Sequence, residues 1–208
     1  MIVSKWTVAV QDKAFEAQIR RLASDASTAI SKANAALTKG LDNAQHEWFT
    51  KCFGAPAAQQ IDEIKSRVHG MAYAMSSAKI TFQYNVNCTA GKNAEAFPPN
   101  LASWQDAASP DAASPAIPTI SDINSNAFVM TICPLMMSRQ TILSTTKQNL
   151  IGTFIHEFSH LIANTFDRTL ADGRAAYDTL AFTLAGESAM RASQNAENYG
   201  FFCANFKS

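Results

Sequence analysis

His156, Glu157 and His160 have the residue types and spacing of a metal-dependent hydrolytic centre. Two histidines four residues apart in a helix share one face, so both imidazole rings can reach one tetrahedral ion. The intervening glutamate lies beside the same ion and can take a proton from metal-bound water, whose pKa the ion lowers to about 7. This pairing is the chemical content of the H-E-x-x-H motif, and we expect Zn²⁺ as the cofactor.

The residues around the motif predict a helix from about Thr145 to Asn164 that is buried on most sides. Apolar residues cover most of its circumference, and a narrow polar stripe runs through them, formed by Asn149, Thr153, His156, His160 and Asn164. A core helix whose histidines bond only to the backbone is the alternative, but burying two imidazoles and a carboxylate without partners is costly. We therefore expect one side of this helix to face a cleft.

The composition indicates one compact domain with an adequate core. The chain has 208 residues, 47% of them hydrophobic, and its 17 basic residues balance its 17 acidic residues. Because there is no basic run, nothing points to a nucleic-acid partner. No apolar run is long enough for a membrane span, and residues 1–18 lack the pattern of a signal peptide.

The cysteines leave the redox state open. They are widely spaced, contain no C-x-x-C pair and do not form a zinc site by themselves. They permit two disulfides with three connectivities, as in an oxidising compartment, or four thiols, as in a cytosolic protein. Secretion or export without a classical signal peptide is the resulting hypothesis for localisation. The four residues are Cys52, Cys88, Cys133 and Cys203.

The elements that must position the motif are predicted to be mostly helical, in a single α+β domain over residues 1–208 with a small antiparallel sheet. We expect a helical part over about 10–78, a strand and loop part over about 79–134, and a catalytic helical part over about 135–208. Hydrophobic periodicity and turn residues predict the elements within these parts. They are one long helix or two in series over 13–49, a helix over 57–77, strands over 79–86 and 126–133, a long surface loop over 89–124, and helices over 174–192 and 196–206.

A catalytic zinc site needs a third protein ligand and an open position for water. No third histidine follows the motif at a suitable distance, and the nearest following glutamate, Glu187, is 27 residues beyond His160. The segment after the motif offers two aspartates, Asp167 and Asp172. We therefore expect one of these carboxylates to complete the ligand set.

Over most of its length the chain resembles the aspzincin metallopeptidases, the group of deuterolysin and peptidyl-lysine metalloendopeptidase. The final similar block, residues 195–199, is Asn-Ala-Glu-Asn-Tyr and is similar to the family's Asn-Ala-Asp-x-Tyr signature. The resemblance implies a zincin-like fold, a zinc-dependent endopeptidase and a site of two histidines and one aspartate. The other similar stretches are WFTKCFG, Cys88-Thr89-Ala90-Gly91, the strand ending at Cys133, Gly152-Thr153 ahead of the motif, Tyr177 and Leu184-Ala185.

The chain departs from the family in the spacing of the third ligand. The family usually carries Gly-Thr-x-Asp with a tyrosine three residues later. Here Asp167 keeps the Thr-x-Asp spacing but lies ten residues before Tyr177, whereas Asp172 lies five residues before it. We favour Asp172 as the ligand, because ligand and tyrosine should converge on one ion from the start of the same helix. Asp167 is the alternative, and Tyr177 is expected to stabilise the oxyanion.

Glu197 stands where lysine-preferring members of the family place an acid that receives the substrate ammonium. A carboxylate there could do so through a charge-assisted bond. One turn later, however, Gly200 replaces the family's second acidic residue. A glutamate favoured by a helix N-terminus is the alternative role. A preference for Lys after the scissile bond is therefore a hypothesis, with Glu197 as the substrate-binding residue.

The resulting prediction is a zinc endopeptidase acting on a protein or peptide substrate. A secreted effector or toxin amidase using the same zinc site is one alternative. A catalytically degraded, metal-stabilised binding module is another, although the intact Glu157 argues for activity. The sequence does not indicate an oligomeric state.

Overall fold

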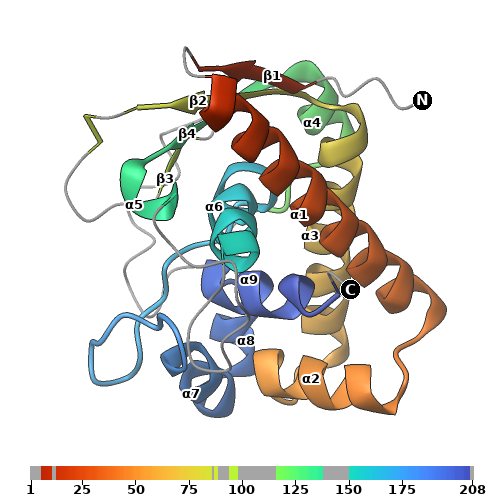
Figure 1. Cartoon of the computed structure of the whole chain (residues 1–208). Coiled ribbons are helices and arrows are strands. Elements are labelled where there is room, and N and C mark those ends of the chain that lie inside the picture. The colour runs from red at the N-terminus through yellow and green to blue at the C-terminus, as the bar shows by residue number, and fades with distance from the viewer. Residues whose placement is uncertain are drawn as a thin grey trace.

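Figure 1 shows how helices and a small sheet enclose α6, the helix that carries the motif. The computed structural model describes residues 6–10, 13–85, 87–88, 94–97, 116–137 and 150–206. The strands are β1 Trp6–Ala9, β2 Lys79–Tyr84, β3 Ala94–Phe97 and β4 Ala127–Ile132. The helices are α1 Lys13–Lys39, α2 Asn43–Phe53, α3 Ala58–Ser77, α4 Ile120–Ser125, α5 Pro134–Met137, α6 Leu150–Ala163, α7 Leu180–Glu187, α8 Ala189–Ala192 and α9 Ala196–Ala204.

Helix α6 is almost wholly enclosed by the rest of the fold. All its residues are buried except Ile151 and Glu157, which are partly exposed. Helices α1, α3 and α9 pack against it, and the sheet approaches it where the ring centroids of Phe82 and Phe154 lie 5.3 Å apart. A helix that is apolar on almost every side is stable only in such surroundings. The predicted burial of the motif helix is confirmed.

The sheet is mixed, and the expectation of a small antiparallel sheet is wrong. Its strand order is β1-β2-β4-β3, in which β1 with β2 and β2 with β4 are parallel and only β3 with β4 is antiparallel. The chain passes through α1, α2 and α3 between β1 and β2. A crossover of that length returns the chain in the same direction, so it favours parallel pairing.

Several predicted elements agree with the structure, and two segments differ. The N-terminal region forms two helices in series, α1 and α2, and α3, β2 and β4 lie where hydrophobic periodicity placed them. The short β1, with Val8 as its one buried residue, was not predicted. The described parts of the expected loop contain β3 and α4. None of the described helices is both long and apolar enough to cross a lipid bilayer.

The helix expected over 174–192 is found only in its later part, as α7 and α8, and is wrong in its first part, which belongs to a hairpin formed by residues 168–176. The Ala176 N–H donates to the Arg168 carbonyl and the Leu170 N–H to the Arg174 carbonyl, each at 2.8 Å. Gly173, with φ of 85°, allows the chain to reverse at the tip. The two ends of the hairpin, eight residues apart along the chain, therefore lie side by side. Helices α7 and α8 follow it.

The four cysteines form one disulfide and two buried thiols. Cys88 and Cys133 are bonded to each other, and they follow β2 and β4, the two central strands of the sheet. Cys52 in α2 and Cys203 in α9 are free and buried. This arrangement differs from both sequence-based possibilities, two disulfides or four thiols.

Helix α2 ends against α7 at a position that only glycine fits. Gly54 has φ of 71°, and its N–H donates to the Thr50 carbonyl at 2.7 Å. A Cβ atom there would lie 2.2 Å from the Ala185 carbonyl oxygen in α7. The bare backbone of Gly54 therefore sets how closely these two helices approach.

We expect Gly54→Ala to lower the free energy of unfolding by about 2–4 kcal/mol, because left-handed strain and overpacking against rigid backbone add together. Gly40→Ala is the matched control, since Gly40 has φ of 104° but its Cβ atom would meet nothing within 4 Å. That control should lose only about 1 kcal/mol. Urea unfolding of both variants measures the difference, and equal losses would contradict the close-approach explanation.

Candidate active site

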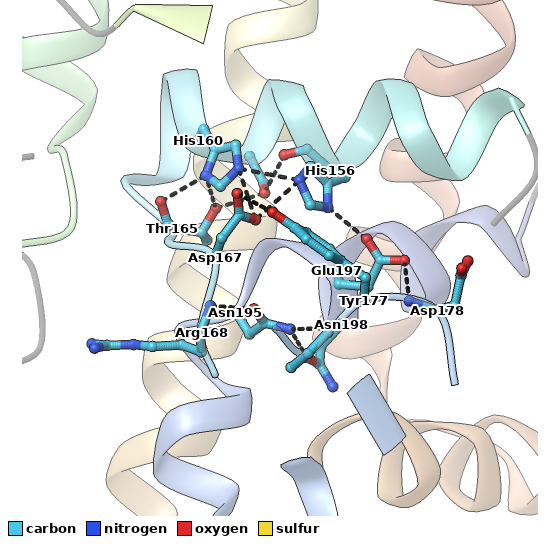
Figure 2. A network of polar contacts seen from close by, with 12 residues as sticks. His156, His160, Thr165, Asp167, Arg168, Tyr177, Asp178, Asn195, Glu197 and Asn198 are labelled. Atoms are coloured by element: carbon cyan, nitrogen blue, oxygen red, sulfur yellow. Dashed lines mark hydrogen bonds and ion pairs between the residues drawn. The ribbon is translucent and has the colours of Figure 1, made fainter. Parts of the chain in front are cut away.

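His156 and His160 converge from consecutive turns of α6. Their Nε2 atoms lie 3.2 Å apart, and their rings are nearly perpendicular, with centroids 4.8 Å apart. Both side chains are buried, with 7% and 5% of the residue surface exposed. Figure 2 shows the two rings side by side below the helix. The spacing predicted from the sequence therefore brings both nitrogens to one point.

A hydrogen bond to the opposite nitrogen fixes the orientation of each imidazole. The His160 Nδ1–H donates to the Thr165 carbonyl at 2.8 Å, and His156 Nδ1 lies 2.7 Å from Glu197 Oε2. With the proton on Nδ1, each ring presents the lone pair of Nε2 to the shared point. This is the arrangement in which protein histidines bind metal ions.

Asp167 supplies a third donor atom at the same point. Its Oδ1 lies 3.2 Å from His156 Nε2 and 3.4 Å from His160 Nε2. Ligands held about 2.0–2.1 Å from a tetrahedral zinc ion are separated by roughly 3.3 Å. The mutual distances of the three atoms fit that geometry, so the described residues are suited to hold Zn²⁺.

Asp172 does not approach the histidines. It lies at the tip of the 168–176 hairpin, where its side chain is 52% exposed and its Oδ2 accepts a hydrogen bond from Arg174 Nη2 at 2.7 Å. The preference for Asp172 assumed that the ligand and Tyr177 share the start of one helix. The hairpin removes that assumption, and the structure brings the alternative, Asp167, to the two histidines.

Glu157 lies beside the point at which the two Nε2 atoms meet. Candidate ligand atoms of His156, Glu157 and His160 all lie within 4.8 Å of one another. Burial raises the pKa of the Glu157 carboxyl above its ordinary value, although the two histidines act in the opposite direction. A raised pKa strengthens this carboxylate as a base for a nearby water.

Tyr177 reaches the site from the second end of the hairpin. Its hydroxyl donates to Asp167 Oδ2 at 2.8 Å, and its ring centroid lies 6.1 Å from that of His156. Burial and the Asp167 carboxylate raise the pKa of Tyr177 well above its ordinary value. The phenol therefore remains a hydrogen-bond donor at neutral pH. Tyr177 is 45% exposed, so this side of the site is open to solvent.

Glu197 lies behind His156, on the side of the ring opposite Nε2. It is 6% exposed, and besides its contact with His156 its Oε1 accepts the Asp178 N–H at 3.0 Å. Both carboxylate oxygens thus face protein donors. This position differs from the expected substrate-binding role, which requires a carboxylate available to an incoming ammonium group.

The carboxylates around His156 create a field that favours positive charge. Burial by itself lowers the pKa of His156, but Asp167 and then Glu197 raise it, and the pKa lies well above its ordinary value. The pKa of Asp167 is lowered, because the attraction of His160 and His156 exceeds the opposing effect of burial. The same field would stabilise a cation between these side chains.

Sequence analysis assigned no role to the groups that hold the chain around Asp167 in place. Asn195 Oδ1 accepts the Arg168 N–H at 2.8 Å, and Nδ2 donates to the Ala176 carbonyl at 3.3 Å (Figure 2). The carbonyl of Thr165 anchors His160. A pattern of side chains cannot indicate which backbone carbonyl will accept a hydrogen bond. For Asn195 the sequence did contain a signal, because this residue begins the block that is similar to the family signature.

Comparison with known proteins shows that the segment containing this site is similar to a known family. Residues 115–204 match the aspzincin family, which is described as lysine-specific metallo-endopeptidase, and this segment contains all the side chains of the site. A solved structure of a zinc peptidase from Grifola frondosa is similar to the chain with a TM-score of 0.62 and 18% identity, over 93% of this chain and 96% of that chain. At that identity the likeness concerns the fold alone. A search of curated protein sequences gave no match.

The family match and the structural likeness agree with each other. The resemblance of this chain to the aspzincin metallopeptidases, which the sequence motifs indicated, is confirmed.

Proposed function

We propose that the protein is a zinc-dependent endopeptidase. The observation that carries the proposal is the convergence of three donor atoms, His156 Nε2, His160 Nε2 and Asp167 Oδ1, at 3.2–3.4 Å from one another. The aspzincin match and the fold shared with a zinc peptidase support the same reaction class. The substrate is accordingly a protein or peptide.

His156, His160 and Asp167 would hold the ion, and the solvent-open side of the site leaves room for water and substrate. When bound, Zn²⁺ lowers the pKa of water to about 7 and polarises a carbonyl group. Glu157 takes the proton from the attacking water as its oxygen adds to the scissile carbonyl carbon. The same carboxyl then returns the proton to the leaving amine as the C–N bond breaks.

Tyr177 serves as a donor for the developing oxyanion. Its hydroxyl lies at the site, where its one proton is donated to Asp167 Oδ2 and would turn to the substrate oxygen as the oxyanion forms. Because its pKa is raised, the phenol keeps its proton while negative charge grows on the substrate oxygen. A neutral donor positioned in this way lowers the barrier by electrostatic stabilisation of the transition state.

Glu197 acts on His156 rather than on the substrate. A carboxylate that accepts the Nδ1–H of a ligand histidine fixes the tautomer of the ring and increases its basicity. The Asp178 N–H occupies the other oxygen of Glu197, so the carboxylate has little capacity to receive a lysine side chain. A preference for Lys after the scissile bond, if the enzyme has one, would then depend on other groups.

The choice between the two aspartates is tested by metal binding. Asp167→Ala should weaken zinc affinity by at least about 100-fold, because loss of a direct ligand exceeds the effect of changing a supporting residue. Asp172→Ala is the matched control and should bind zinc as the wild type does, since its carboxylate pairs with Arg174 at the hairpin tip. Competition with a chromophoric chelator measures both affinities. Retained binding in Asp167→Ala would refute the proposed ligand set.

The role of Glu157 is tested by separating metal binding from turnover. Glu157→Gln should retain one zinc ion per chain and lose roughly 100- to 10,000-fold in kcat on a fluorogenic peptide, the range expected for a general base. Chelator treatment of the wild type should abolish hydrolysis, and added zinc should restore it. Hydrolysis that persists at wild-type rate in Glu157→Gln would exclude this mechanism.

The role of Glu197 is tested by cleavage-site profiling on a peptide library. Glu197→Gln should leave the residue preference after the scissile bond unchanged, and it should weaken zinc affinity by about 10- to 100-fold. Profiling at saturating zinc keeps the two effects apart. Enrichment of Lys in the wild type that disappears in Glu197→Gln would instead restore the substrate-binding role.

A further inference from the structure

We propose that Asn195 is a positioning residue that holds Asp167 and Tyr177 together across the base of the 168–176 hairpin. The inference rests on the proposed function, because it assigns a purpose to the arrangement of these two side chains. It adds a residue that touches neither metal nor substrate and acts only through the backbone.

The amide of Asn195 connects the two arms of the hairpin. Its Oδ1 accepts the Arg168 N–H at 2.8 Å, and its Nδ2 donates to the Ala176 carbonyl at 3.3 Å. Arg168 directly follows Asp167, and Ala176 directly precedes Tyr177. One side chain therefore fixes the backbone next to both functional residues.

The two arms present groups of opposite kind at this point. One arm offers an N–H and the other a carbonyl, so the bridging side chain must accept from the first and donate to the second. An amide does both, whereas a carboxylate can only accept. Asn195 is 1% exposed, so water has little access to replace either bond.

The remaining contacts of Asn195 attach the arms to a rigid platform. Its Nδ2 also donates to Asn198 Oδ1 at 2.6 Å, and Asn198 Nδ2 donates to the Ala181 carbonyl at 2.9 Å and the Cys52 carbonyl at 2.5 Å. Phe166, which directly precedes Asp167, is bonded to the backbone on both sides of Asn195. Its N–H donates to the Gln194 carbonyl, and its carbonyl accepts the Ala196 N–H, each at 2.8 Å. These bonds fix the position of the hairpin relative to the N-terminal end of α9.

The hairpin has little packing of its own that could hold its arms in place. Its buried apolar residues, Leu170 and Ala176, form a small cluster with Leu184 in α7 and the partly buried Leu180. The Asp167 side chain is 41% exposed and Tyr177 is 45% exposed. A segment with so few buried contacts opens locally at low cost unless specific bonds restrain it. Asn195 supplies such a restraint at the base of the hairpin. The Arg168 side chain adds a bond to Gln194 Oε1, and the Ala171 N–H donates to Glu187 Oε2 at 3.0 Å in the outer part of the hairpin.

The first test compares Asn195→Ala with the wild type at the level of the metal site. The variant should bind zinc about 10- to 100-fold more weakly, the range found for supporting residues. At saturating zinc, kcat should fall at least about 10-fold while KM changes less than about 3-fold, because Tyr177 is misplaced for the transition state. The visible absorption bands of the Co²⁺-substituted protein should lose intensity, because a displaced Asp167 would no longer complete a tetrahedral set of ligands.

Tyr199→Phe is the matched control, since Tyr199 is equally buried in α9 and loses one hydrogen bond, from its hydroxyl to the Ser193 carbonyl at 2.6 Å, which involves neither arm of the hairpin. It should lower thermal stability and keep zinc affinity within about 3-fold of the wild type. Asn195→Asp keeps the acceptor for Arg168 and loses the donor to Ala176, so its loss of zinc affinity should be smaller than its loss in kcat. If Asn195→Ala does not fold, the measurements on Asn195→Asp decide the test.

The outcomes separate this inference from the proposed function. A wild-type protein that neither binds zinc nor hydrolyses peptides would refute the proposed function itself. A functional wild type with Asn195→Ala and Asn195→Asp equal to it in zinc affinity, kcat and Co²⁺ spectrum would overturn only the positioning role. Equal loss of zinc affinity in Asn195→Ala and Tyr199→Phe would also overturn it, because the effect would then be general destabilisation.

Discussion

The structure depends on bringing three donor atoms within 3.4 Å of one another in a site that is largely buried. Two of these atoms come from α6 and one from a segment beyond its end. Nitrogen and oxygen lone pairs at such distances repel one another unless a proton or a cation lies between them. The surrounding fold must therefore hold the groups together, and it does so through bonds to their opposite sides: Thr165 behind His160, Glu197 behind His156, and Tyr177 on the second oxygen of Asp167.

These supporting bonds converge on two elements with different properties. Helix α6 is almost wholly buried and gains its stability from apolar packing against the sheet, α1, α3 and α9. The N-terminal end of α9 instead carries buried polar side chains that are joined by hydrogen bonds. Because an unsatisfied polar group in such a place is costly, the network tolerates few other arrangements. Apolar packing fixes where the histidines lie, and the polar network fixes where their partners lie.

The parts of the site that local sequence determines could be predicted, and the parts that depend on tertiary contacts could not. The spacing of His156 and His160 defines one face of a helix, and the apolar residues around them define its burial. The sheet was mispredicted because strand direction depends on the path between strands rather than on the strands themselves. The role expected for Glu197 came from its position in the sequence, whereas its partners, His156 and Asp178, come from other elements.

The proposed third ligand, Asp167, shows the same limit most clearly. Counting residues from Asp167 to Tyr177 gives ten, a separation that argued against two side chains meeting at one ion. The number of residues between Asp167 and Tyr177 does not determine their distance, because the two arms of the hairpin pair with each other and bring its ends together. The hairpin is constrained at its base by the backbone bond between Ala176 and Arg168 and by the amide of Asn195. Nearer the tip, the Leu170–Arg174 backbone bond and the bond from the Ala171 N–H to Glu187 constrain it as well. At the tip, the exposed side chains of Asp172 and Arg174 pair with each other rather than with the groups of the site. In a fold of this kind, the distance between two functional residues along the chain carries less information than the hydrogen bonds that hold their neighbours together.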